Sequence, residues 1–210
     1  VLRREPLVAL VDDFVDEAEC AALRAHVDGR LKRARTGAKT AGDEGELDSY
    51  RRALSATIEV DPYDGDDAAT RVSERVFALA REVAGLRAWL PGQEALSVIE
   101  YGANDEYRPH CDGNCAGGPY ERGQRAATAI AFCETAARGG ATAFTRGGLV
   151  ITPRPRQLLL FAYKHANGSM DDGHTEHSGC PVDEGRKWIV TQWLREDVSL
   201  EKPWYSFDNW

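Results

Sequence analysis

Long apolar segments and an excess of basic charge are both missing from this 210-residue sequence. It contains no run of eighteen apolar residues, so no segment predicts a membrane span. Acidic residues outnumber basic residues by 34 to 26, and the formal net charge is −8. This balance argues against a nucleic-acid partner, which would require a basic surface. The 42% hydrophobic content is instead typical of a packed globular protein.

Cysteine is scarce and odd in number, with Cys20, Cys111, Cys115, Cys133 and Cys180 in the whole chain. An odd count leaves at least one cysteine unpaired in a monomer, and the spacing does not show which cysteines pair. Cys133 follows the apolar run 129–132 and is expected to be a small buried hydrophobic side chain. Cys111 and Cys115 lack a second pair that would complete a structural zinc site, so we expect none there.

The chain begins at Val1 rather than at methionine, and we expect it to be part of a longer protein. The secretory pathway and the cytoplasm both remain open as compartments, as does the oligomeric state. The length fits one domain, and no linker, repeat or low-complexity tract divides it. We therefore expect one domain over 1–210, with a supporting region of helices and strands over 1–93 and a β-rich core over 94–210.

Apolar periodicity predicts two helices in the first part of the chain. The first follows Asp13 or Asp16, either of which can cap it, and the second covers 67–86 and ends at Gly85. Strands are expected at 7–11 and 54–60, whereas 33–49 has almost no large apolar residue and predicts a loop that could close over a substrate. The aromatic-rich end, 204–210, is expected to pack on the core.

The second part of the chain alternates short apolar runs with Gly, Pro and Asp turns. The runs with strand character are 96–99, 126–133, 141–144, 149–151, 157–163 and 188–194. Short strands at regular spacing indicate a β-sandwich or barrel. The expected fold is therefore mostly β with supporting helices (α+β), with a helical N-terminal layer packed on a β-sandwich.

The segment His110-Cys111-Asp112 is the first sign of a metal site. Residues two apart in a strand share one face, so the imidazole and the carboxylate can reach one ion. Two histidines and one carboxylate on one side of an ion leave open positions opposite, as non-haem iron(II) oxygenases require. The short motif occurs often by chance, and a surface turn is the alternative interpretation.

A third ligand must come from one of the remaining histidines. His165 and His174 are the competitors, and His174 has the character of a loop residue. His177 is favoured because Cys180-Pro181-Val182 and a basic strand follow it.

Lys187 begins the apolar run 187–194 and shares one strand face with Ile189, Thr191 and Trp193. A lysine on the inner face of a sandwich needs an anionic partner, because burying an unpaired ammonium group is costly. The distal carboxylate of 2-oxoglutarate would be a suitable partner. A solvent-exposed lysine at a strand edge is the alternative.

Several blocks together resemble the prolyl 4-hydroxylase family of iron(II)- and 2-oxoglutarate-dependent dioxygenases. They occur in the family's order over almost the whole chain: Asp13-Phe14, Glu19-Cys20, Tyr50-Arg51-Arg52, Ser73-Glu74-Arg75, Tyr101-Gly102, Tyr107-Arg108-Pro109-His110-Cys111-Asp112, residues 123–128, residues 139–144, residues 177–182, Gly185-Arg186-Lys187-Trp188 and Trp193. The resemblance implies a double-stranded β-helix, or jelly-roll, core.

Carried over position by position, the resemblance implies that His110, Asp112 and His177 bind iron(II). Lys187 would bind 2-oxoglutarate, helped by Tyr101 and Thr142, with Trp193 packed beside it. Three more residues match positions near the family's peptide groove: Glu94, Tyr107 and Arg125. Each could instead have an ordinary structural role.

The chain departs from the family where the family meets its substrate. The loop between Asp112 and Arg125 is short, the usual Arg-Thr-Ser segment is replaced by 51–55, and Arg195 stands where some relatives carry histidine. These departures leave the iron-binding residues intact. The late Gly-Asp turn of the family is Arg156-Gln157 here.

The implied activity is hydroxylation of proline in a peptide or protein, like that of procollagen-proline 4-dioxygenase. Iron(II) is the expected cofactor, 2-oxoglutarate and O2 the co-substrates, and ascorbate a reductant. Hydroxylation of a free amino acid or another small molecule on the same core is one alternative. A non-catalytic binding module with the same fold is another, and a zinc hydrolase is disfavoured because no HExxH motif is present.

Overall fold

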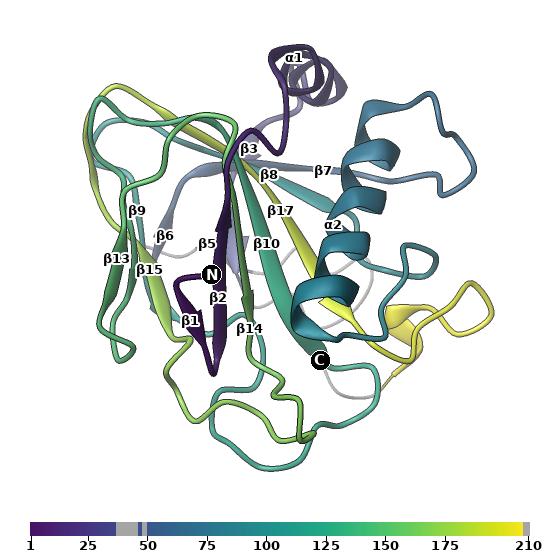
Figure 1. Cartoon of the computed structure of the whole chain (residues 1–210). Helices are drawn as coiled ribbons and strands as arrows, with labels where there is room; N and C mark the ends of the chain where they lie inside the picture. Colours follow the sequence, from purple (N-terminus) through teal and green to yellow (C-terminus); the bar gives the residue numbers. More distant parts are fainter. Residues whose placement is uncertain (37–45, 48–49, 208–210) are drawn as a thin grey trace.

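Two antiparallel sheets face each other and form a jelly roll in the computed structural model, which describes residues 1–36, 46–47 and 50–207. Helix α2 covers the outer face of the larger sheet, and α1 lies near one end of that sheet (Figure 1). This arrangement confirms the expected mostly-β fold with supporting helices.

The larger sheet has eight strands and takes members from both ends of the chain. Its spatial order is β1 (Arg3–Arg4), β2 (Leu7–Val11), β14 (Leu158–Ala162), β10 (Arg125–Glu134), β17 (Lys187–Arg195), β8 (Leu96–Tyr101), β7 (Leu54–Ile58) and β3 (Lys32–Arg33). The predicted strands 7–11 and 54–60 thus join the sheet that the later strands build.

The smaller sheet has five strands and carries much of the functional sequence. Its order is β13 (Leu149–Ile151), β12 (Thr142–Phe144), β15 (His177–Gly179), β9 (Glu106–His110) and β6 (Arg51–Arg52). Two further ribbons pair β11 (Arg138–Gly139) with β16 (Val182–Glu184), and β4 (Arg35–Thr36) with β5 (Glu46–Leu47). Periodicity did not predict β9, β15 or β16, because these strands are short and polar.

Both helices begin and end at the residues that their sequences indicate. Asp16 caps α1 (Glu17–His26) in a capping box with Glu19, and Asp67 caps α2 (Ala68–Ala84). Gly85 ends α2 with a φ of 65°, a left-handed conformation that glycine adopts without a steric penalty. Among the described residues, no helix is both long enough and apolar enough to cross a membrane.

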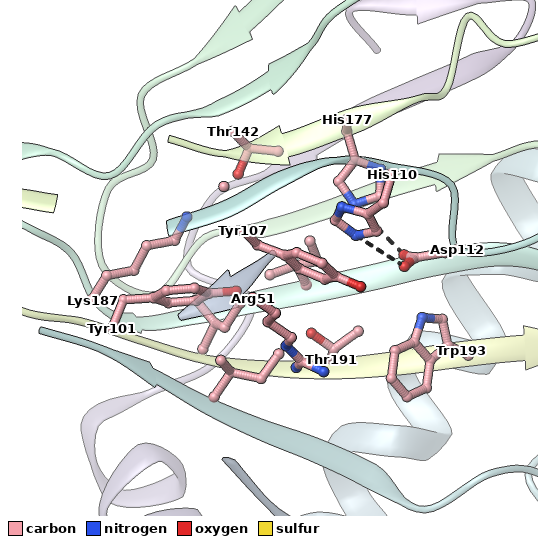
Figure 2. A pocket seen from close by; sticks show the side chains of 14 residues that line it. Arg51, Tyr101, Tyr107, His110, Asp112, Thr142, His177, Lys187, Thr191 and Trp193 are labelled. Atoms are coloured by element: carbon pink, nitrogen blue, oxygen red, sulfur yellow. Dashed lines mark ion pairs between the residues drawn. The ribbon is translucent and has the colours of Figure 1, made fainter. Parts of the chain in front are cut away.

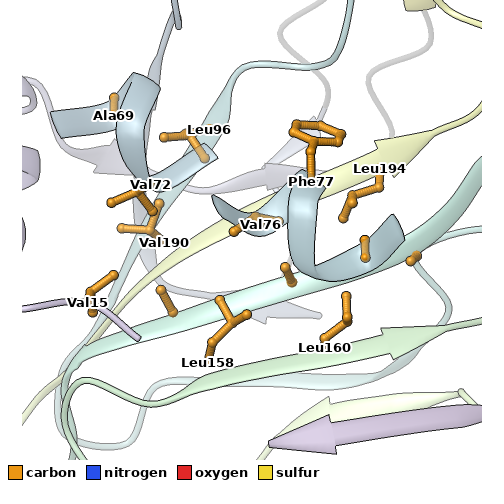
Figure 3. Close-up of a cluster of buried hydrophobic side chains, with 14 of the residues drawn as sticks. Val15, Ala69, Val72, Val76, Phe77, Leu96, Leu158, Leu160, Val190 and Leu194 are labelled. Atoms are coloured by element: carbon orange, nitrogen blue, oxygen red, sulfur yellow. The ribbon is translucent and has the colours of Figure 1, made fainter. Parts of the chain in front are cut away.

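Strand β14 shows how the larger sheet serves two cores, because its alternate side chains point to opposite faces. Leu158 and Leu160 pack with α2 residues such as Val76 (Figure 3). Leu159 and Phe161 pack on the other face, in the layer between the two sheets. Burial on both faces explains why this strand reads as a continuous apolar run rather than an alternating one.

The predicted loop over 33–49 needs a partial correction. Strand β3 ends at Arg33, the first residue of this range. Strand β4 lies within its first part, and β5 lies near its end. The remaining positions, 37–45 and 48–49, lie outside the described residues, as does the closing role suggested for them. At the other end of the chain, Phe207 is buried as expected, whereas the 3-10 helix Trp204–Ser206 contains no buried residue and Tyr205 is exposed; 208–210 lie outside the described part.

Disulfides correct the expectation for Cys133. It is bonded to Cys20, which ties α1 to the end of the central strand β10. Cys111 is bonded to Cys115, and Cys180 is the free cysteine that the odd count required. Both cysteines of the first bond lie among apolar neighbours, which is why Cys133 had the sequence character of a buried hydrophobic residue.

Removing the Cys20–Cys133 bond should lower the free energy of unfolding by about 2–4 kcal/mol, because the bond closes a long loop in the unfolded chain. The double variant Cys20→Ser/Cys133→Ser would be compared with Cys180→Ser in denaturant unfolding under non-reducing conditions. Cys180→Ser should change little. A double variant as stable as the parent would show that α1 is held by packing alone.

Candidate active site

A cavity between the two sheets gathers most of the predicted site residues. The smaller sheet brings His110 opposite His177 where β9 pairs with β15, and the larger sheet brings Lys187 opposite Tyr101 where β17 pairs with β8. Figure 2 shows Lys187 at one end of this cavity and His110, Asp112 and His177 at the other. Most of the site thus rests on strands of both sheets.

Three ligand atoms converge at the histidine end of the cavity. Asp112 Oδ1 lies 3.4 Å from His110 Nε2, and Asp112 Oδ2 lies 3.7 Å from His177 Nε2. The two rings are oriented by their other nitrogens, which lie 2.8 Å from the Arg108 carbonyl oxygen and 3.1 Å from the Thr175 carbonyl oxygen. Each ring therefore presents its Nε2 atom toward the carboxylate, as a metal site needs.

The backbone position of Asp112 differs from the expected one. Strand β9 ends at His110, so Asp112 lies in the following turn and not on the same strand face. Its side chain nevertheless reaches both histidines, because the turn brings it back over the cavity. The predicted grouping is correct, although the strand periodicity that suggested it does not extend to Asp112.

Burial and mutual interactions together set the protonation states of His177 and Asp112. Burial lowers the pKa of His177 to about 4, so the imidazole is neutral at neutral pH and can donate its lone pair. Burial alone would raise the pKa of Asp112, but interaction with His177 and a hydrogen bond with His110 hold that pKa well below its usual range. A neutral imidazole beside an ionised carboxylate is the form in which these side chains bind a metal.

The competing histidines lie elsewhere. His165 contacts Glu5, and His174 lies 2.7 Å from Asp172 in a separate polar group. Neither lines the cavity that holds His110 and His177. Of the three candidates for the third ligand, His177 is the one that the fold brings to His110 and Asp112.

Lys187 is buried, with 2% of its surface exposed, and faces into the cavity. Within the described part of the chain, no carboxylate pairs with its ammonium group; the rings of Tyr101 and Phe132 lie 5.6 Å from Nζ. Burial lowers the pKa of Lys187 to about 8. A buried cation that faces an open cavity without an anion is suited to bind an anionic ligand.

The period-two pattern of β17 is confirmed. Ile189, Thr191 and Trp193 line the same cavity as Lys187. Trp188, on the other face, packs in the core under α2. A single strand thus separates the ligand cavity from the hydrophobic layer that supports it.

Aromatic and polar side chains complete the cavity wall. Tyr107 stacks on the His110 ring with 3.5 Å between ring centroids, and Tyr101 and Thr142 lie at the Lys187 end. Burial raises the pKa of Tyr101 to about 12, so its phenol stays protonated and can donate a hydrogen bond. Arg51 reaches in over the Tyr107 ring, with its carbon Cζ 5.0 Å from the centroid.

Glu94 and Arg125 lie behind the cavity wall. Glu94 is buried and accepts hydrogen bonds from both Arg125 and Arg195, with each Nε atom 2.7 Å from Oε1. Burial opposes ionisation of Glu94, but the two guanidinium groups hold its pKa below the usual value. Neither Glu94 nor Arg125 lines the cavity, so their role toward a substrate stays a prediction, whereas Tyr107 does line it.

Three further residues belong to the site beyond those singled out from the sequence as ligands. Arg51 and Thr191 line the cavity, and the Thr128 hydroxyl donates a hydrogen bond of 2.7 Å to Asp112 Oδ2. The alternation in β17 placed Thr191 on the cavity face. Arg51 and Thr128 belong to segments that resemble the family, and 51–55 was placed near the substrate, but no individual role was predicted for either residue, because their proximity to the site arises only when distant segments fold together.

Comparison with known proteins agrees with this geometry. The profile of the 2OG-Fe(II) oxygenase superfamily matches residues 96–195. Prolyl 4-hydroxylase subunit alpha-3 of Rattus norvegicus is 33% identical over 203 residues, which cover 93% of this chain and 35% of that protein. Prolyl 4-hydroxylase subunit alpha-2 of Caenorhabditis elegans is 29% identical with the same coverage. The chain spans about a third of the length of these curated relatives.

Solved structures share the fold at lower identity. The viral collagen prolyl hydroxylase of Paramecium Bursaria Chlorella virus-1, solved with 2OG, superposes with a TM-score of 0.68 at 20% identity and covers 90% of this chain and 95% of that chain. A Trichoplax adhaerens prolyl hydroxylase, solved with a hypoxia inducible factor peptide fragment, gives a TM-score of 0.63 at 17% identity and covers 90% and 84%.

Metal binding should depend on His177 and not on His174. In an anaerobic titration with Co(II) or Fe(II), His177→Ala should weaken binding by about 100-fold or more, because it removes a ligand and not merely an outer partner. His174→Ala removes a histidine three residues before His177, outside the cavity, and serves as the control. Equal loss in both variants, or loss in His174→Ala alone, would place the metal elsewhere.

Proposed function

Because the chain belongs to the 2OG-Fe(II) oxygenase superfamily, we propose that it is an iron(II)- and 2-oxoglutarate-dependent dioxygenase that hydroxylates proline in a peptide or protein. One observation carries this proposal. A His-Asp-His group and an unpaired buried lysine lie at opposite ends of one cavity. The proposal takes 1–210 as one dioxygenase domain, with 1–93 as the supporting region and 94–210 as the catalytic core.

The metal ligands in this proposal are His110, Asp112 and His177. Their two imidazole nitrogens and one carboxylate suit iron(II) and leave positions open on the cavity side. When bound, iron(II) supplies oxygen activation coupled to decarboxylation of 2-oxoglutarate to succinate, with hydroxylation of a C–H bond as the outcome. The protein holds the ligand atoms in place and keeps the cavity shielded from bulk water.

Lys187 is the proposed partner of the distal carboxylate of 2-oxoglutarate. Tyr101 supplies a protonated phenol near it, and Thr142 supplies a hydroxyl from the opposite sheet. Trp193 lines the cavity near Asp112, at the end away from Lys187 (Figure 2). Lys187 and the proposed metal ligands lie apart along the cavity. This separation would orient 2-oxoglutarate, an elongated dianion, with its distal carboxylate toward Lys187 and its other end toward the metal.

The proposed substrate is proline in a peptide or protein, by analogy with the named relatives. Tyr107 lies in the cavity wall beside His110 and is the substrate-facing candidate that the geometry favours most. Glu94 and Arg125 would act from behind this wall, through Trp193, whose ring lies 3.8 Å below the Arg125 guanidinium carbon. Ascorbate is the proposed reductant, and a nucleic-acid partner is not expected from the net charge of −8.

Succinate formation tests the reaction and the substrate together. We expect succinate to be formed from 2-oxoglutarate only with iron(II), and to increase with proline-rich peptides but not with free proline. Asp112→Asn should abolish it. Stimulation by free proline alone would indicate a small-molecule hydroxylase. Bound iron without succinate under any condition would indicate a non-catalytic module.

Lys187 makes 2-oxoglutarate binding dependent on pH. Its pKa of about 8 in the empty cavity should rise when a carboxylate binds, so binding at pH 8 should take up about half a proton. Affinity should accordingly decrease as the pH rises above 8, because the neutral amine no longer pairs with the carboxylate.

Calorimetry of the anaerobic iron(II) protein in buffers of different ionisation enthalpy measures this proton uptake. Lys187→Arg is the matched variant, because its guanidinium stays charged and should take up no proton. At pH 6 the parent should also take up almost none. The same uptake in the parent and in Lys187→Arg at pH 8 would mean that another group anchors the ligand or titrates with it.

A further inference from the structure

Asp112 differs from the other two proposed metal ligands in how its side chain is oriented. His110 and His177 are each fixed by a backbone carbonyl within two residues of themselves, at Arg108 and Thr175. Asp112 lies beyond the end of β9, so neither strand pairing nor a local carbonyl sets the rotation of its carboxylate. Apart from its contacts with the two histidines, the contact that fixes its orientation must come from a different part of the chain.

Thr128 provides this orientation. Its hydroxyl donates to Asp112 Oδ2 at 2.7 Å, and the residue is completely buried. We propose that Thr128 is a positioning residue that fixes the rotation of the Asp112 carboxylate and thereby sets the metal affinity of the site. This inference rests on the proposed metal site and adds a residue that does not itself contact the metal.

The position of Thr128 in the sheet makes it a rigid support. It lies in β10, between Phe161 of β14 and Trp193 of β17, so strands flank it on both sides. Its β-branched side chain has few rotamers, which restricts the direction in which the hydroxyl can point. A hydrogen bond from such a residue holds its acceptor more firmly than one from a loop side chain.

The chain around Asp112 is fixed from two more sides. Arg125 donates to the Asp112 carbonyl oxygen at 3.0 Å. The ring of Tyr163 packs against Gly113, where an added Cβ would lie 2.4 Å from Cε2 of that ring. These contacts hold the backbone of the turn, and they leave the carboxylate rotation to Thr128.

The hydrogen bond also makes the two carboxylate oxygens unequal. Oδ2 accepts from Thr128, while Oδ1 faces His110 Nε2 at 3.4 Å without a bond from Thr128. A carboxylate that accepts this hydrogen bond at Oδ2 keeps Oδ1 directed toward His110 before any metal arrives. Loss of this hydrogen bond should therefore lower the affinity for the metal, because the carboxylate would have to become ordered during binding.

Co(II) titration of the anaerobic apoprotein, followed by the absorption of the bound metal, measures this effect without turnover. Thr128→Val keeps the shape and removes the donor, and we expect the Kd to rise about 10- to 100-fold. Thr128→Ser keeps the donor and should bind within a few-fold of the parent. Turnover of Thr128→Val should recover as iron(II) is raised.

Thr70→Val is the matched control for a general loss of stability. Thr70 is also completely buried, and its hydroxyl donates to the Asp61 carbonyl oxygen at 2.8 Å, but it lies on α2, in the helical layer outside the larger sheet. Its metal Kd should stay that of the parent. Thermal unfolding of the apoproteins would show whether both variants remain folded.

Two results would overturn the inference. One is a Thr128→Val protein that is folded and binds Co(II) as tightly as the parent; the other is an equal loss of affinity in Thr70→Val. A parent protein that binds no Co(II) would overturn the proposed metal site as well, so the two failures are distinguishable.

Discussion

A buried ammonium group that pairs with no carboxylate among the described residues is the constraint around which the rest of the site is arranged. Lys187 lies at the start of β17, where the two sheets approach and water is scarce. Such a charge is costly to bury, and the fold keeps it only because one side of it opens on the cavity. The cavity thus favours a ligand with a carboxylate at that end, and the proposed metal ligands at the other end would determine where the ligand's opposite end lies.

The same strand links this site to the stability of the fold. On one face of β17, Ile189, Thr191 and Trp193 continue the cavity wall from Lys187; on the other, Trp188 and Val190 pack under α2. The helix layer is therefore more than a cover. It holds the strand that carries the cation, and it does so through apolar burial that no ligand contact disturbs. Such a division separates the residues that line the cavity from those that stabilise the sheet.

What the sequence predicted follows from local chemistry. The Asp16 cap, the Gly85 end of α2 and the alternation in β17 are each readable within a few residues, and the structure confirms them. The Cys20–Cys133 bond and the contact of Thr128 with Asp112 were not predictable in this way, because each joins segments that are distant in the sequence and meet only in the folded chain. The choice of His177 over His174 was possible from its sequence neighbours, although only the fold brings it to His110.

The departure at Arg195 shows how the substrate side and the metal side depend on each other. Arg195 is buried and shares Glu94 with Arg125, so it is not placed to meet a substrate directly. Arg125 in turn stacks over Trp193 and donates to the Asp112 carbonyl oxygen. One buried carboxylate thus serves both guanidinium groups, and Arg125 is held where it supports the cavity wall and the backbone of Asp112 at once.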